Sequence, residues 1–196
     1  MTERVTLKNL CKIRIGHAFR GRVSSTLGGQ LAVVQPRDIS MSGKLLADSV
    51  EYVDLSILKP AQLLNEGDIL LVGRGRIAAT VYLNQLEPNS IASGALFVLT
   101  MRDQTAVRPD YVAMYLNSHE GRVALSRLGA RTTAAFLNRA NLEQLEIPVP
   151  EPSIQQSLAA LNNTKKRFLD LSARKAAIID RVIGRELKFN NKDQAV

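Results

Sequence analysis

The last quarter of the chain carries a helical pattern of apolar residues. After Pro152, about thirty-five residues contain neither glycine nor proline except Gly184. Apolar side chains recur there at alternating spacings of three and four, which places them in one stripe along a helix. Pro152 and the potential N-cap Ser153 define its start. The stripe consists of Ile154, Leu158, Leu161, Phe168, Leu171, Ile178, Ile179 and Val182.

The predicted helix is long relative to the rest of the chain. At about 1.5 Å per residue it extends for roughly 50 Å, whereas a domain of 150 residues has a radius of gyration of about 15 Å. One alternative is that the helix folds back onto its own domain. We favour self-association, through Ile154, Leu158, Leu161, Phe168, Leu171, Ile178 and Val182, with Lys175 as a polar interruption of the stripe.

The first 150 residues have the pattern of a single α+β domain. Strands are predicted at 31–35, 69–72, 78–83 and 95–99, and helices at 109–116 and 120–128. Residues 142–149 are predicted to return to the sheet. Because strands come first and helices later, an α+β domain with a mixed sheet is expected. The resulting domain organisation is 1–150 for the domain, 151–189 for the long helix and 190–196 for a polar tail.

Composition narrows the chemistry further. The 196 residues suffice for one domain with an extension. The single cysteine, Cys11, cannot form an internal disulfide, and no Cys/His cluster has metal-ligand spacing. The chain shows no leader pattern and no apolar run long enough to span a membrane. We therefore expect a cytoplasmic protein without a metal site or a cofactor.

Catalytic and nucleotide-binding patterns are not found. The two histidines, His17 and His119, have no nucleophile motif nearby. The segment Gly73–Arg76 follows a predicted strand, but it lacks the third glycine of a dinucleotide-binding loop and the Lys-Ser/Thr of a P-loop. We therefore predict no catalytic residues.

The charge of the chain indicates a polyanionic partner. The formal net charge is +8, with a pI of about 9.9. In residues 1–150 arginine outnumbers lysine 13 to 4, and several arginines lie in glycine-containing segments typical of exposed loops. The planar guanidinium group pairs well with phosphates and guanine edges, so this distribution favours nucleic acid over solubility alone.

Three motifs, in order along the chain, resemble a known family. They are Leu63–Leu71 before Gly73–Arg76, then Gly129–Thr133, and Leu145–Pro150 leading to Ile154–Gln156. These segments are similar to the "L-x-x-GDIL" segment, the late "G-(S/T)-T" loop and the "IPLP-x-x-x-Q" junction of specificity subunits of type I restriction-modification systems. The chain resembles one half of such a subunit: a target recognition domain followed by a long conserved helix. It departs from the pattern by an Ala-Arg insertion in the Gly-Thr loop and by Ser153–Gln156, where the family often has an acid before the glutamine.

The resemblance implies a non-catalytic protein that reads a half-site in double-stranded DNA. It would direct a DNA adenine methyltransferase to a bipartite site, with a translocating nuclease subunit as an optional further partner. Family members usually carry two halves whose helices pack antiparallel, so a single half is expected to form a homodimer. We predict a DNA-facing surface of Lys12, Arg14, His17, Arg20, Arg22, Gln35, Arg37, Arg74, Arg76, Arg131 and Thr132.

Two other functions are compatible with the same sequence features. A stand-alone dimeric DNA-binding regulator would share the basic surface but would not copurify with a methyltransferase. An interaction protein that uses only the helix would not bind DNA in a salt-sensitive way. Phe19 is open to two interpretations, a core residue or an aromatic wedge at the DNA.

Overall fold

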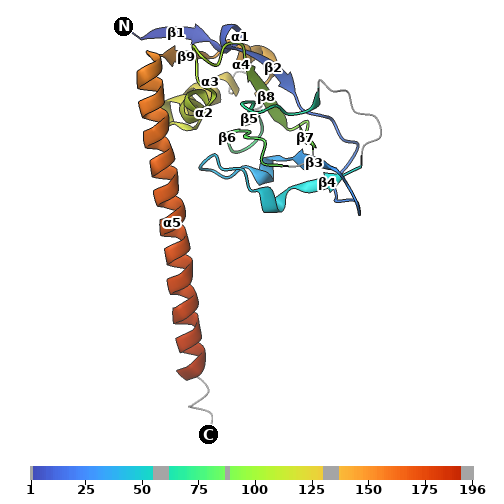
Figure 1. The fold of residues 1–196 in the computed structure, drawn as a ribbon, viewed down its shortest axis with the longest axis vertical. Coiled ribbons are helices and arrows are strands. Elements are labelled where there is room, and N and C mark those ends of the chain that lie inside the picture. Colours follow the sequence, from blue (N-terminus) through green and yellow to red (C-terminus); the bar gives the residue numbers. More distant parts are fainter. Residues whose placement is uncertain (1, 55–61, 87–88, 130–136, 191–196) are drawn as a thin grey trace. The chain divides into compact units, whose positions relative to one another are not determined.

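The computed structural model describes residues 2–54, 62–86, 89–129 and 137–190 (Figure 1). Its strands are β1 (Glu3–Thr6), β2 (Cys11–Ile15), β3 (Leu31–Val34), β4 (Glu51–Val53), β5 (Ile69–Val72), β6 (Ala79–Val81), β7 (Asn89–Ala92), β8 (Leu96–Met101) and β9 (Glu146–Val149). Its α-helices are α1 (Leu7–Leu10), α2 (Pro109–Asn117), α3 (His119–Gly129), α4 (Arg139–Glu143) and α5 (Pro152–Asn190). Two short 3-10 helices, η1 (Pro36–Asp38) and η2 (Ala47–Ser49), complete the order.

The strands form three small sheets. A four-stranded antiparallel sheet has the order β2-β8-β5-β6. A three-stranded sheet, β4-β3-β7, is mixed, because β3 runs antiparallel to β4 and parallel to β7. Strands β1 and β9 pair as a separate antiparallel ribbon, which joins the start of the chain to the segment just before α5. The expected α+β class with a mixed sheet is confirmed.

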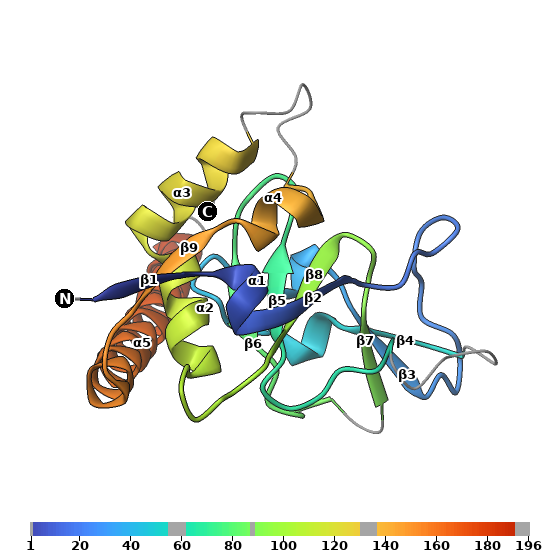
Figure 2. The same cartoon turned by 90° about the horizontal axis from the view of Figure 1, so that it is seen from above.

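Burial on both faces of the four-stranded sheet explains its apolar strands. In β5, Ile69 and Leu71 face a core shared with α2, α3 and α4. The alternate residues Leu70 and Val72 face a second core shared with the three-stranded sheet. Figure 2 shows α2 and α3 on one side of β5 and β8, and β3, β4 and β7 on the other. A strand covered on both faces has no solvent side, so its sequence is continuously apolar rather than alternating.

By the density of its internal contacts the chain divides into two units, which consist of residues 1–159 and 160–196. The first two turns of α5 therefore belong to unit 1, and the remainder of the helix forms unit 2. In unit 2 the side chains are described up to Arg185, and the predicted polar tail from residue 191 lies outside the described residues.

Two of the sequence predictions need correction. Residues 142–149 do not form one strand, because α4 occupies 139–143 and only Glu146–Val149 is extended. The Asn138 side chain caps α4 by accepting a hydrogen bond from the backbone N–H of Asn141 at 2.7 Å. Strand β9 then pairs with β1 rather than with the main sheet.

A buried glutamine joins α5 to the rest of unit 1. Gln155 has no exposed surface. Its side-chain oxygen accepts a hydrogen bond from the backbone N–H of Arg108 at 3.0 Å. Its side-chain nitrogen donates to the carbonyl oxygens of Ala106 at 3.1 Å and Pro150 at 2.8 Å. One amide therefore holds the segment before α2, the end of β9 and the first turn of α5 together.

Two further observations limit the chemistry of the described part of the chain. No helix in it combines the length and the apolar character that a membrane crossing requires. The Cys11 thiol is buried, donates to the carbonyl oxygen of Leu7 at 3.2 Å, and has its pKa raised to about 12 by burial. The thiol is therefore protonated at neutral pH.

We expect Gln155→Leu to lower the free energy of unfolding by about 2–4 kcal/mol, because it removes the three hydrogen bonds that the buried amide makes with the backbone. Urea denaturation measures the change. Gln156→Leu is the matched control, since the neighbouring Gln156 is exposed and its replacement should change the free energy by less than about 0.5 kcal/mol. Equal losses in both variants would show that the amide contacts contribute nothing.

Candidate nucleic-acid interface

The residues predicted to face DNA come from five segments. These are β2, the β2–β3 connection, the end of β3 with η1, the β5–β6 connection, and the segment that contains Arg131 and Thr132. The last of these lies outside the described residues. The others can be placed through their hydrogen bonds.

The β2–β3 connection crosses the end of the three-stranded sheet. The backbone N–H of His17 donates to the carbonyl oxygen of Ala92 at 2.7 Å, and His17 forms an isolated parallel bridge with Ser93. A side chain at Gly16 would lie 2.2 Å from the carbonyl oxygen of Ser93, so this crossing requires glycine. Phe19 packs against the small core around Val33, with its ring edge-on to His17 at 4.8 Å. Of the two interpretations of Phe19, the structure favours the core residue.

A tight turn gives the same connection a defined tip. The backbone N–H of Gly29 donates to the carbonyl oxygen of Thr26, and that of Thr26 donates to the carbonyl oxygen of Tyr52, both at 2.9 Å. Gly28 has a φ of +77°, which is a left-handed conformation that glycine adopts without strain. Leu27 is fully exposed at the tip. The connection between β2 and β3 is visible at the edge of unit 1 in Figure 2.

Hydrogen bonds link this connection to η1 and to the β5–β6 connection. The backbone N–H of Ser93 donates to the carbonyl oxygen of Val34, the residue before Gln35, at 2.8 Å. The Arg76 guanidinium donates to the carbonyl oxygens of Pro36, the first residue of η1, and Ile39, the residue after it. The β2–β3 connection, η1 and the β5–β6 connection therefore adjoin one another along one edge of unit 1.

Leu137, the first described residue after the segment that contains Arg131, adjoins the same edge. The backbone N–H of Leu137 donates to the carbonyl oxygen of Gly73 at 3.4 Å. Gly73 itself is buried, and a side chain there would lie 2.5 Å from the Phe97 ring. The chain thus returns to the β5–β6 connection directly after residue 136.

Arg14 is engaged inside the protein rather than presented to a ligand. Its guanidinium donates to the carbonyl oxygens of Gln62 at 3.2 Å and Leu63 at 2.8 Å, and it lies 3.7 Å from the buried Asp68 carboxylate. Burial lowers the pKa of Arg14, and the Asp68 charge opposes that shift. Asp68 also accepts a hydrogen bond from Thr100 at 2.6 Å. This arrangement supports a structural role for Arg14.

A second acidic group organises η1. Asp38 is completely buried and accepts hydrogen bonds from the backbone N–H of Gln35 and the hydroxyl of Ser49, both at 2.8 Å. Burial raises the pKa of Asp38, against the effect of these hydrogen bonds and of Arg37. Arg37 forms an ion pair with Glu51 and lies 3.7 Å from Asp38, yet its side chain is 45% exposed. One face of Arg37 thus stays accessible.

Only some of the residues predicted to face DNA have polar groups that are exposed. Lys12, Arg20 and Arg22 are exposed and form no hydrogen bond or ion pair within the described ranges, and Arg74 is exposed as well. The side-chain nitrogen of Gln35 and the hydroxyl of Ser93 are buried without a hydrogen-bond partner among the described residues. Ser93 was not predicted, and its only sequence signal is a Ser-Gly pair between two strands.

The residues predicted for self-association lie on α5. Ile154 and Leu158 are in its first turns, which belong to unit 1, and the other five are in unit 2. All seven are between 38% and 68% exposed. Leu169, Ile179 and Ile183 extend the same apolar surface. A row of apolar side chains of this size is unusual on a monomer surface and is typical of a binding face.

Comparison with solved structures identifies the fold, whereas comparison of sequences finds no match. No protein-family model matches the chain, and no curated protein matches its sequence. Solved structures do match. A chain from a structural study of complex assembly and conformational transition of the type I R-M system has a TM-score of 0.66 at 17% identity, over 93% of this chain and 43% of that one.

Two further structures agree. The HsdS subunit from Thermoanaerobacter tengcongensis has a TM-score of 0.59 at 19% identity, over 86% of this chain and 38% of that chain. The type I restriction-modification S subunit from M. genitalium has a TM-score of 0.55 at 16% identity, over 87% and 39%. This chain spans less than half the length of each of these proteins. It has the fold of a type I restriction-modification specificity subunit, over one recognition unit and one long helix.

Proposed function

We propose that this chain is a non-catalytic DNA specificity subunit. Unit 1 reads a short half-site in double-stranded DNA and directs a DNA adenine methyltransferase to it, and a translocating nuclease is an optional further subunit. The observation that carries the proposal is the convergence of three predicted segments along one edge of unit 1, in a fold shared with type I specificity subunits. The net charge of +8 supports a polyanionic ligand.

The exposure and the hydrogen bonds of each side chain along this edge indicate its role in DNA binding. The exposed Arg20 and Arg22 contact phosphates and set the register on the duplex. Gln35 has a buried amide nitrogen without a partner, and a glutamine amide forms two hydrogen bonds with the major-groove edge of adenine. Arg76 holds the β5–β6 connection against η1 and acts through the position of its neighbour Arg74.

The second part of the proposal is a homodimer formed through α5. Its exposed apolar stripe is self-complementary under a two-fold axis, because the same residues lie on both copies. The basic character of the helix opposes pairing, since residues 160–185 contain seven lysines and arginines against two aspartates. Added salt screens this repulsion and leaves the apolar contact intact.

DNA binding is tested by removing two exposed charges. Replacing Arg20 and Arg22 with alanine should weaken binding to every duplex and reduce the slope of log K against log salt by about 0.9 per lost phosphate contact. A gel-shift titration at several salt concentrations measures both quantities. The matched control replaces Arg102 and Arg139, which carry the same charge on other elements. Equal effects of the two pairs would refute this placement of the interface.

Self-association is tested on α5. Leu161→Asp and Phe168→Asp each place a charge in the apolar stripe and should convert the dimer to a monomer at tens of micromolar, as measured by light scattering. Asn163→Asp adds the same charge about 200° around the helix from Leu161 and should leave the mass unchanged. Raising the NaCl concentration should tighten the wild-type dimer. A wild-type monomer at these concentrations would exclude the proposed interface.

The symmetry of a homodimer determines the form of its DNA target. The same side chains meet the same base edges on both sides, so the recognised sequence should be two inverted copies of one half-site around a fixed spacer. Four residues inserted into each α5 would lengthen it by about 6 Å and should select a different spacer. Methylome sequencing of cells that carry the protein with its methyltransferase identifies the target. Two unlike half-sites would contradict the homodimer.

A further inference from the structure

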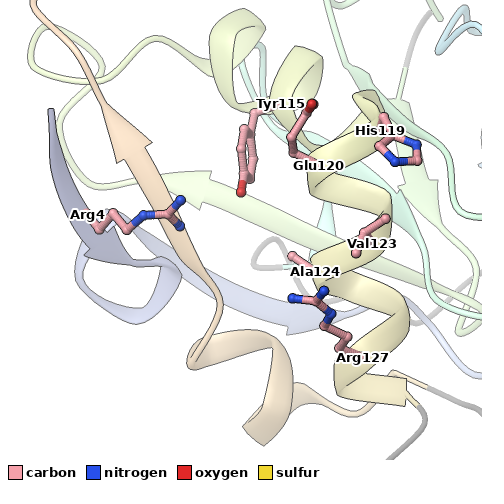
Figure 3. Close-up of a pocket in the computed structure, with 7 residues that line it drawn as sticks. All are labelled: Arg4, Tyr115, His119, Glu120, Val123, Ala124 and Arg127. Carbon is pink, nitrogen blue, oxygen red and sulfur yellow. The ribbon is translucent and has the colours of Figure 1, made fainter.

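A pocket of about 280 Å³ lies in unit 1, on elements other than those of the proposed DNA interface (Figure 3). It is bounded by β1, the last turn of α2 and one face of α3. The lining residues are Arg4, Tyr115, His119, Glu120, Val123, Ala124 and Arg127. The pocket thus combines cationic, aromatic and aliphatic groups.

The corner between α2 and α3 fixes the shape of this pocket. The Ser118 hydroxyl accepts a hydrogen bond from the backbone N–H of Gly121 at 3.0 Å and so caps α3. A side chain at Gly121 would lie 2.0 Å from the carbonyl oxygen of Tyr115, so the two helices meet at van der Waals contact. Tyr115 and the first turn of α3 are therefore held in a constant relation.

Two arginines give the lining of the pocket an excess of positive charge. Neither Arg4 nor Arg127 forms a hydrogen bond or an ion pair with any residue that the structure describes. Glu120, the single acid of the lining, has its pKa lowered by hydrogen bonds from its own backbone N–H and from Ser118. Its carboxylate points away from Arg127 in Figure 3.

The remaining lining is suited to an apolar group. Ala124 and Tyr115 pack against the core that α2 and α3 share with the four-stranded sheet. Val123, next to Ala124 in the chain, is half-buried. In Figure 3 the Tyr115 hydroxyl and the Arg4 guanidinium point toward each other across the pocket. A bound group would therefore contact the guanidinium groups of Arg4 and Arg127 and the hydroxyl of Tyr115. The aliphatic side chains of the lining would contact its apolar part.

These features select a carboxylate side chain with an apolar neighbour. A guanidinium fork pairs with a planar carboxylate through two parallel hydrogen bonds. The volume admits one or two side chains. We propose that this pocket docks an acidic, partly apolar segment of a protein partner. This proposal rests on the proposed function in one respect: the methyltransferase or nuclease subunit would supply the partner segment.

The test uses two synthetic peptides and the full chain. Acetyl-Leu-Glu-Leu-amide and acetyl-Leu-Gln-Leu-amide differ only in charge. Titration into protein labelled at the arginine side chains should shift the Nε–H resonances of Arg4 and Arg127 saturably with the Glu peptide and not with the Gln peptide. Arg4→Gln or Arg127→Gln should raise the Kd by roughly tenfold or more, while Arg139→Gln should not change it.

Each other outcome overturns the proposal. Absence of shifts at both arginines, or equal shifts with both peptides, excludes a carboxylate site. Stronger binding of inorganic phosphate at the same resonances assigns the pocket to phosphate, and shifts caused by a short DNA duplex assign it to the DNA interface. Failure of the proposed function appears separately, as lack of salt-sensitive DNA binding by the wild-type chain. The wild-type titrations decide the question even if a variant fails to fold.

Discussion

The buried amide of Gln155 determines the position of the first turns of α5 in unit 1. Three backbone groups from two other segments converge on this amide, which itself has no exposed surface. This contact fixes the rotational register of the first two turns of α5, because a shift of one residue would turn their side chains by about 100°. Ile154 and Leu158, the first residues of the apolar stripe, are exposed in this register.

The sequence predicted elements whose signal is local. Strands β3 and β5 were identifiable because both faces are buried, and α2 and α5 because proline marks their first turns. Strands β2 and β7 were missed. In β2 the basic residues Lys12 and Arg14 alternate with apolar ones, and in the sequence their charge indicates a loop. Strand β7 is a strand through its parallel pairing with β3, more than fifty residues earlier in the chain. Such non-local pairing leaves little trace in a short segment.

The candidate site was predictable as a set of segments but not side chain by side chain. Arg14 and Arg22 look equivalent in the sequence, since each lies within two residues of a glycine and of another basic residue. Only the fold brings the carbonyls of Gln62 and Leu63 and the buried Asp68 against Arg14, which engages its guanidinium within the protein. Conversely, Ser93 becomes a candidate only because the β2–β3 connection crosses above it.

In the proposed dimer, apolar burial and charge repulsion act on the same helix. Fully burying one Leu, Ile or Phe side chain contributes about 1.5–3 kcal/mol, whereas an exposed charge pair is worth less than about 1 kcal/mol. The stripe therefore outweighs the excess of basic residues, and Lys175 discriminates between arrangements. A parallel, in-register pair sets the two Lys175 ammonium groups directly opposite each other. An antiparallel pair does so only if its two-fold axis passes through residue 175, so this lysine favours the antiparallel arrangement.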